Sequence, residues 1–285
     1  MREERQKRQI RSAFGQYLSP ALVDRLADHP EQLVLGGETR ELTLLFTDVR
    51  GFTTISESFK SNPQGLTRLM NQFLTALSKA ILDRDVTIDK YMGDAIMAFW
   101  NAPVDLPDHA MRACRAALDM VTQAEAVNAA RRADVAANPG EAMHEIKIGV
   151  GINTGQCVVG NMGSDMRFDY TALGDTVNLA SRLEGQSKAY GLTIILGDNT
   201  AATVADTLAV LEIDLIRVKG KNEPERIHTL LGVEELAGSE AFKALQSANR
   251  TMLEDYRAQR WDKAVEGVGR MRGLAERCGL SLEGY

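Results

Sequence analysis

The sequence is poor in cysteine, and Cys114, Cys157 and Cys278 have no metal or redox spacing. This shortage excludes a disulfide-stapled scaffold and fits a reducing compartment. Apolar runs near the ~20 residues that span a bilayer are also missing. The net charge of −6, without a basic stripe, argues against nucleic acid as a partner. These absences predict a chain that is itself soluble, and 44% hydrophobic residues support an ordinary core.

Two common nucleotide-binding motifs are absent as well. No segment matches G-x-x-x-x-G-K-[ST], which excludes a P-loop. Gly149 and Gly151 have the G-x-G spacing, but they lie inside a predicted strand and so do not form a dinucleotide fingerprint. The sequence therefore lacks both of these phosphate-binding devices.

The rest of the chain is organised around the stretch 42–54. Its apolar start at 42–46 predicts a strand that is buried on both faces. Asp48 follows directly, and a charge at the end of a buried strand must be hydrogen-bonded, paired or bound to a metal. Taken alone, an aspartate in this position is more typical of a helix cap or a turn, so its role depends on its neighbours.

Downstream, apolar spacing predicts alternating helices and strands. Asn62 and Pro63 are typical of a helix N-cap and first turn, and helical periodicity follows over 66–81. Strands at 86–90 and 95–100 flank Gly93 and predict a β-hairpin. The remaining predicted elements are helices at 107–130 and 174–188 and strands at 145–152, 156–159, 193–196, 210–218 and 225–231.

Polar and glycine residues predict turns among the later strands. Asn153, Thr154 and Gly155 are typical of a turn between two short strands, and the segment 160–164 is a second one. The order of elements suits an α+β fold with a ferredoxin-like, β-α-β-β-α-β core and extra strands and helices.

Both ends of the chain are predicted to be helical. An N-terminal linker has two helical pieces, the second opened by Ser19 and Pro20. From Ala241 the pattern is helical only and is similar to one tetratricopeptide-like helix pair. One such pair cannot bury its own face, so it must pack on the body or on a partner. The apolar residues concerned are Phe242, Leu245, Met252, Tyr256, Trp261, Ala264 and Val268.

A second carboxylate strengthens the case that Asp48 is functional. Asp94 follows Gly93 in the predicted hairpin turn, and the first and third strands of a ferredoxin-like core pair with each other, so the two aspartates can meet. Adjacent carboxylates repel unless a proton or a cation separates them. Two carboxylates suggest Mg²⁺ or Mn²⁺, with substrate phosphates completing the shell.

Three motifs resemble the signatures of class III nucleotidyl cyclases. They are F-T-D-V-R-G-F-T at 46–53, D-K-Y-M-G-D-A at 89–95 and G-D-T-V-N-L-A-S-R-L-E at 174–184. The resemblance covers about 38–231 without a large gap, and three motifs in the right order are far more specific than one. It implies a palm-like cyclase domain at 38–234, between a helical signalling segment at 1–37 and a helical extension at 235–285.

The resemblance also implies a two-metal site. Asp48 and Asp94 would be the side-chain ligands of two Mg²⁺ or Mn²⁺ ions, and the Val49 carbonyl would add a ligand. One ion would activate the ribose 3′-hydroxyl and the other would neutralise the pyrophosphate leaving group. Phe52 and Thr53, which follow in the same motif, would contact the substrate.

Further roles carry over from the family by position. Asn178 would position the ribose, and Arg182, four residues on and therefore on the same helical face, would stabilise the α-phosphoryl transition state. The alternative for Arg182 is a surface salt bridge with Glu184. A late-hairpin lysine would reach the triphosphate; Lys219 is favoured over Lys221, although either could be simply solvated.

Base preference would depend on Lys90 and Thr171. Family members that use ATP have lysine and either aspartate or threonine at these positions, whereas guanylyl cyclases have glutamate and cysteine. A lysine ammonium only donates, which suits adenine N1, and a threonine hydroxyl can accept from the adenine N6 amine. Because threonine can also donate, the exclusion of GTP is expected to be leaky.

The sequence thus predicts a bacterial-type adenylate cyclase, a phosphorus–oxygen lyase that makes cyclic AMP and pyrophosphate from ATP. Family members build each site between two subunits, so a homodimer with shared sites is expected. The alternatives are a guanylyl cyclase and a non-catalytic nucleotide-binding regulatory module.

The N-terminal segment suggests a membrane context. It resembles the linker of cyclases that have an upstream membrane sensor. Its five basic residues among the first eleven are either a solvated helix end or the flank of a membrane anchor. The expected location is the cytoplasmic side of a bacterial inner membrane.

Overall fold

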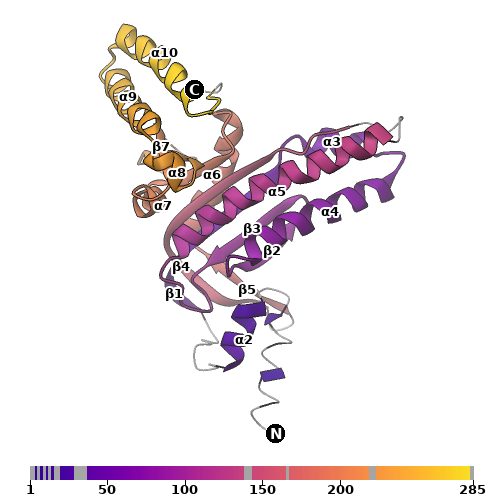
Figure 1. Cartoon of the computed structure of the whole chain (residues 1–285). Coiled ribbons are helices and arrows are strands. Elements are labelled where there is room, and N and C mark those ends of the chain that lie inside the picture. The colour runs from indigo at the N-terminus through magenta and orange to yellow at the C-terminus, as the bar shows by residue number, and fades with distance from the viewer. Residues whose placement is uncertain are drawn as a thin grey trace.

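The computed structural model describes residues 4, 7, 8, 11, 14, 15, 20–28, 37–137, 143–164, 167–217 and 223–282. Figure 1 shows the arrangement of the elements, which are α2 (Pro20–Asp28), β1 (Glu38–Val49), α3 (Phe52–Ser58), α4 (Pro63–Leu82), β2 (Thr87–Met92), β3 (Ala95–Trp100), α5 (His109–Ala137), β4 (Ile148–Ser164), β5 (Arg167–Leu173), α6 (Asp175–Ala189), β6 (Ile194–Gly197), α7 (Asp198–Val204), β7 (Ala209–Ile216), β8 (Glu225–Gly232), α8 (Glu234–Gly238), α9 (Glu240–Arg257) and α10 (Trp261–Arg277). Within this part of the chain no helix is both long enough and apolar enough to cross a membrane.

The strands of the described residues form one sheet in the order β2-β3-β1-β4-β6-β8-β7, with β5 paired to β4 outside this path. Neighbours among β2, β3, β1 and β4 are antiparallel, and α4 and α5 complete a β-α-β-β-α-β unit. The predicted α+β fold with a ferredoxin-like core is therefore confirmed. Within the described sheet, β4 and β6 are the pair that runs in parallel.

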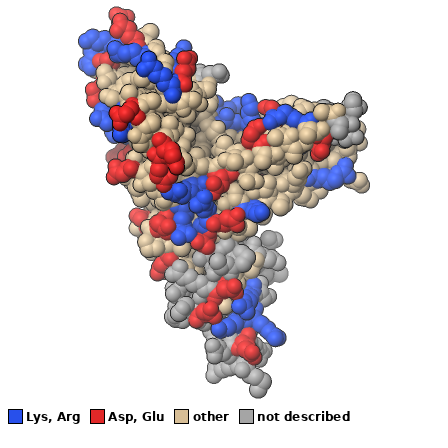
Figure 2. All heavy atoms as spheres, viewed as in Figure 1, with Lys and Arg blue, Asp and Glu red and all other residues tan. Residues whose placement is uncertain are grey.

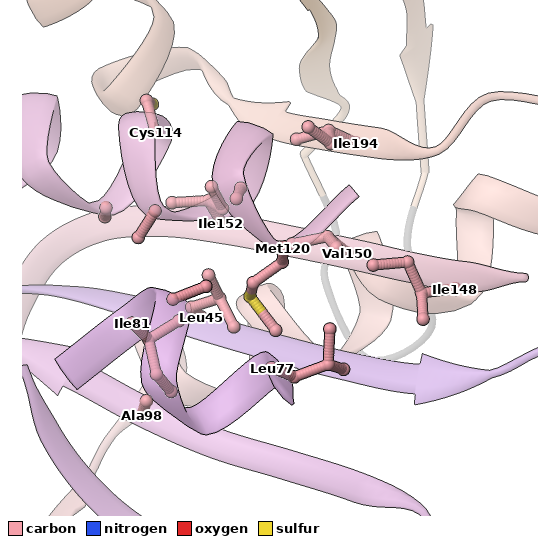
Figure 3. Packing of buried hydrophobic residues seen from close by; sticks show 14 of the residues in the cluster. Leu45, Leu77, Ile81, Ala98, Cys114, Met120, Ile148, Val150, Ile152 and Ile194 are labelled. Atoms are coloured by element: carbon pink, nitrogen blue, oxygen red, sulfur yellow. The ribbon is translucent and has the colours of Figure 1, made fainter. Parts of the chain in front are cut away.

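The central strand β1 is covered on both faces, as its apolar sequence predicts. Leu45 belongs to a core that α4 and α5 complete, and Figure 3 shows Leu45, Leu77 and Met120 converging from β1, α4 and α5. Leu42 and Leu44 lie in a second core on the other face, together with residues of α2 and α6. Because successive side chains of β1 point to opposite faces, they contribute to two separate apolar cores.

The predicted turn at Asn153, Thr154 and Gly155 is wrong, because these residues lie inside the continuous strand β4. They pair with Leu44, Thr43 and Leu42 of β1. The polar side chains are buried but bonded: Thr154 Oγ1 lies 2.8 Å from Thr43 Oγ1, and Asn153 Nδ2 donates to Thr176 O at 3.1 Å. Tertiary pairing overrides the local turn preference because these buried polar side chains find partners.

Two further elements differ from the prediction. The predicted turn at 160–164 is wrong, because this segment continues β4 and pairs with the unpredicted strand β5. The short helix α3 is also not predicted; it begins after Gly51, whose φ of +70° is costly for residues with a side chain. Both features lie next to proposed site residues, so the sequence-based prediction is least accurate near the site.

The C-terminal helix pair packs on the body of the chain, one of the two arrangements the sequence allows. Phe242, Leu245 and Met252 of α9 are buried in a third core with Leu211 and Ile213 of β7. On the face seen in Figure 2, charges of both signs are mixed over these helices. Tyr256 and Trp261 are exposed and make an edge-to-face contact, with ring centroids 5.6 Å apart.

Helix α6 lies directly on β4 because residue 151 is glycine. A Cβ at Gly151 would fall well inside van der Waals contact of the Ala180 carbonyl and the Glu184 amide, which are backbone atoms of α6. By contrast, Gly185 on the same helix is exposed, and a methyl group added there would meet open space. The distance between α6 and the sheet therefore depends on the missing side chain at 151.

This contact predicts that Gly151→Ala is destabilising. The added methyl would push α6 off the sheet, and overpacking of this kind costs about 1–3 kcal/mol. The matched control is Gly185→Ala, which should leave stability unchanged or raise it by up to about 1 kcal/mol through helix propensity. Urea unfolding of the three proteins measures both values, and equal stability of Gly151→Ala and the parent would contradict the contact.

Candidate active site

Asp48 and Asp94 meet at one end of the sheet. The β1–β3 pairing ends with Thr47 opposite Ile96, which places Asp48 next to the two-residue turn after β2. In that turn Gly93 has φ +67°. The Asp48 carboxyl accepts a hydrogen bond of 2.8 Å from the Val49 amide and lies close enough to Asp94 to raise the pKa of that carboxyl. The structure therefore brings the two predicted metal ligands together.

The pair has the chemistry of a cation site. Burial, followed by the hydrogen bond and charge of Asp48, raises the pKa of Asp94 to about 7. Asp94 Oδ2 is buried and has no hydrogen-bond partner among the described residues. A bound cation would give this oxygen a partner and remove the repulsion. Two carboxylates together with a nearby backbone carbonyl are hard oxygen donors that fit Mg²⁺ or Mn²⁺.

The protein supplies only part of a coordination shell here. In the described part of the chain, no group of three or more His, Cys, Asp and Glu side chains is placed to hold a metal ion. An ion held by this pair would need further oxygens from elsewhere, and substrate phosphates commonly supply them to Mg²⁺.

The other residues of the first motif follow the carboxylate pair directly. Val49 is buried at the end of β1 and pairs with Ile148. Phe52 is half-buried, Thr53 is exposed, and both begin α3. Phe52 and Thr53 are therefore close to Asp48 in the chain, and their contact with a substrate stays a prediction.

Asn178 and Arg182 lie on α6, as their motif predicts. The helix begins after Gly174. Asn178 is exposed and Arg182 is half-buried. The Arg182 Nη1 atom is buried without a hydrogen-bond partner among the described residues, so this atom does not make the salt bridge considered as the alternative. An unpaired buried guanidinium nitrogen is suited to receive an anion.

The two predicted catalytic sets lie on different elements of the chain. In the described residues no hydrogen bond or ion pair joins Asn178 or Arg182 to Asp48 or Asp94. Glu184 of α6 interacts with Asp48. Burial and the Asp48 charge raise the pKa of Glu184, and the Arg50 charge partly opposes this rise. Sequence reasoning gave Glu184 no role at the site, although it closes the third motif.

The two predicted base-contacting residues are brought together by a third. Thr171 Oγ1 in β5 donates a hydrogen bond to Asp89 Oδ2 in β2, and Lys90 Nζ forms an ion pair with Asp89 Oδ1 at 3.1 Å. The Asp89 side chain is fully buried, whereas the Lys90 side chain is partly exposed. Asp89 opens the second motif, but sequence reasoning gave it no role.

The predicted triphosphate lysines cannot be placed. Lys219 and Lys221 both lie outside the described residues, between β7 and β8. The choice between them therefore stays a prediction from the sequence.

Known proteins resemble this chain over nearly the same residues as the predicted cyclase domain. Residues 36–232 match the family described as the adenylate and guanylate cyclase catalytic domain. Adenylate cyclase 1 of Rhizobium meliloti is 37% identical over 194 residues, which cover 68% of this chain and 28% of that protein. Adenylate cyclase of Anabaena cylindrica is 34% identical over 194 residues, covering 67% and 36%. The chain thus spans about a third of the length of these curated relatives.

Solved structures agree with the fold and include proteins of both nucleotide preferences. The adenylyl cyclase CyaB from P. aeruginosa is 34% identical, with a TM-score of 0.62, over 69% of this chain and 96% of that chain. The guanylyl cyclase Cya2 is 31% identical, with a TM-score of 0.62, over 70% and 96%. The match to well over half of the sequence shows that this chain belongs to the adenylate and guanylate cyclase catalytic-domain family.

Proposed function

We propose that this chain is an adenylyl cyclase, which converts ATP to 3′,5′-cyclic AMP and pyrophosphate. The observation that carries the proposal is the Asp48–Asp94 pair, whose buried Asp94 oxygen lacks a partner among the described residues. The names of the Rhizobium and Anabaena relatives support the same activity.

The reaction is an internal displacement at phosphorus. The ribose 3′-oxygen forms a bond to the α-phosphorus, the bond from that phosphorus to the β-bridging oxygen breaks, and the hydroxyl proton is lost. Two Mg²⁺ or Mn²⁺ ions, held by Asp48, Asp94 and the Val49 carbonyl, would supply positive charge to the 3′-oxygen and to the pyrophosphate. The carboxylates fix that charge where negative charge develops.

The remaining residues act on the substrate directly. The unpartnered Arg182 nitrogen donates to an α-phosphate oxygen, whose charge grows in the transition state. Asn178 holds the ribose with its 3′-hydroxyl in line with the α-phosphorus. Lys219 binds the triphosphate, and Phe52 and Thr53 contact the substrate beside the metal ligands.

Lys90 and Thr171 select the base. Lys90 donates to adenine N1, and the Thr171 hydroxyl accepts from the N6 amine. The support for this pairing is that both residues contact the same Asp89 carboxylate. A guanine would present N1–H to the Lys90 ammonium, so two donors would face each other.

The active sites are proposed to be shared across a homodimer. One subunit contributes Asp48 and Asp94, and the other contributes the base, ribose and transition-state residues. Large apolar side chains exposed on β2, β4 and β5 offer a surface for the second subunit; they are Tyr91, Met92, Val158 and Leu173.

The domain arrangement and location are proposed from the sequence. The cyclase domain would occupy 38–234, with the linker at 1–37 receiving a signal and the helices of 235–285 packed on the body. An upstream membrane sensor would hold the protein at the cytoplasmic face of the bacterial inner membrane. The support is the resemblance of the N-terminal segment to such linkers.

The activity is tested by assaying ATP and GTP, each with Mg²⁺ and with Mn²⁺. Cyclic AMP should form from ATP in preference to cyclic GMP from GTP, because Lys90 cannot accept a hydrogen bond. Dominant cyclic GMP production would favour the guanylyl cyclase alternative. Absence of product under all four conditions would favour the non-catalytic regulatory alternative.

Shared sites are tested by mixing two inactive variants. Asp48→Ala and Asn178→Ala should each lose at least about 100-fold in activity. An equal mixture should recover about a quarter of the parent activity, since about half of the dimers are mixed and each keeps one intact site.

The control for this experiment uses two residues of the same set. Mixing Asp48→Ala with Asp94→Ala leaves no intact metal pair, so it should restore nothing. Both mixtures are assayed for cyclic nucleotide production. If the mixture of Asp48→Ala and Asn178→Ala stays inactive, the shared site is contradicted.

Base preference is tested by the double substitution Lys90→Glu and Thr171→Cys. Glutamate can accept from guanine N1–H and N2–H₂, so the ratio of kcat/KM for ATP to that for GTP should fall by at least about tenfold. Both substrates are assayed under one metal condition. A ratio unchanged from the parent would refute the assignment of these two residues.

A further inference from the structure

Asp89 joins the two residues to which base selection is assigned. Its carboxylate accepts a hydrogen bond from Thr171 on one oxygen and faces the Lys90 ammonium at 3.1 Å with the other. Its side chain has no solvent exposure. A buried carboxylate must be hydrogen-bonded or paired with a charge, and here Thr171 supplies the hydrogen bond and Lys90 supplies the opposite charge.

A β-bulge explains how Asp89 and Lys90 come to act at one place. Adjacent side chains of a regular strand point to opposite faces. Between Ile88, which pairs with Ala98, and Lys90, which pairs with Met97, strand β2 contains one extra residue, and that residue is Asp89. A bulge redirects side chains locally, so two neighbours in sequence can act on one ligand.

The hydrogen bond to Asp89 settles the direction of the Thr171 hydroxyl. A hydroxyl has a single proton and two lone pairs. Thr171 gives that proton to Asp89 Oδ2, so only its lone pairs are left for a ligand. Without Asp89 the same hydroxyl could rotate and donate instead.

The surroundings of Asp89 act on its pKa in opposite directions, and the pKa is raised on balance. Burial raises the pKa of the carboxyl, but the polar groups that bond to it oppose this: the Thr171 hydroxyl, the Lys90 ammonium and the Ala172 amide all lower the pKa. Because these are donors, the carboxylate is the form that satisfies them.

We propose that Asp89 is a positioning residue for base selection, because it holds the Thr171 hydroxyl as an acceptor-only group. This inference rests on the proposed cyclase function and deepens it. A purine with an amine at position 6, such as adenine, donates to that hydroxyl. A purine with an oxygen at position 6, such as guanine, presents an acceptor and is rejected. Threonine alone would be ambiguous, and Asp89 makes it selective.

The experiment compares kcat/KM for ATP and for GTP in the parent, Asp89→Ala, Thr171→Val and the double variant. Asp89→Ala should lower the ATP-to-GTP ratio by about tenfold, because the freed hydroxyl can donate to guanine O6. In the Thr171→Val background, removal of Asp89 should change the ratio by less than about twofold. Asp89→Asn, whose amide oxygen still accepts from Thr171, should retain more of the ratio than Asp89→Ala.

Several outcomes would overturn the inference. A ratio that Asp89→Ala leaves unchanged, with ATP turnover intact, refutes it while the cyclase function stands. If removal of Asp89 lowers the ATP-to-GTP ratio equally in the parent and in the Thr171→Val background, Asp89 acts by another route. Thermal unfolding reports whether each variant folds; if Asp89→Ala does not, Asp89→Leu replaces it, because leucine fills the space without an acceptor.

Failure of the proposed function is distinguishable from these results. If the parent makes no cyclic nucleotide from ATP or GTP, the cyclase proposal fails. The inference is then tested by calorimetric binding of ATP and GTP to the same variants. An Asp89-dependent preference for ATP supports it, and an unaltered preference or no binding of either nucleotide overturns it.

Discussion

The pairing of β1 with a strand on each side is the constraint on which the site depends. Twelve consecutive residues of β1 pair with β4 and five pair with β3. A slip of one residue would exchange the faces of β1, because side chains alternate along a strand. It would exchange the side chains that β1 contributes to the two cores and turn Asp48 away from Asp94. The two apolar cores that fix the register therefore also fix the spacing of the carboxylates.

Two charged groups of the proposed site are among the buried polar atoms that lack a hydrogen bond in the described residues. Most buried polar groups in proteins have a partner, yet Asp94 Oδ2 and Arg182 Nη1 form no hydrogen bond among the described residues. Each belongs to a residue to which a role with metal or phosphate is proposed. Their common feature is that a charged nucleotide with its cations would supply the opposite charge.

Sequence reasoning predicted the elements whose signals are local. The N-cap of α4 is an example, since Asn62 accepts from the Gly65 amide at 3.0 Å as expected, and the hairpin at Gly93 is another. The sequence-based prediction was wrong where the pairing of strands determines the local structure. Asn153 and Thr154 have a turn composition but are bonded within a long strand. The bulge at Asp89 is a mismatch between two strands, so no single segment encodes it. The meeting of Asp48 and Asp94 was predictable only through the fold.

The close contact at Gly151 has a geometric consequence. Backbone atoms of α6 occupy the place where a side chain of β4 would be, so a larger residue at 151 would hold the helix farther from the sheet. Arg182 is carried by that helix, and Asp48 is carried by β1, which is paired with β4 along its length. The spacing between the arginine and the aspartate therefore depends on the absence of a side chain at 151.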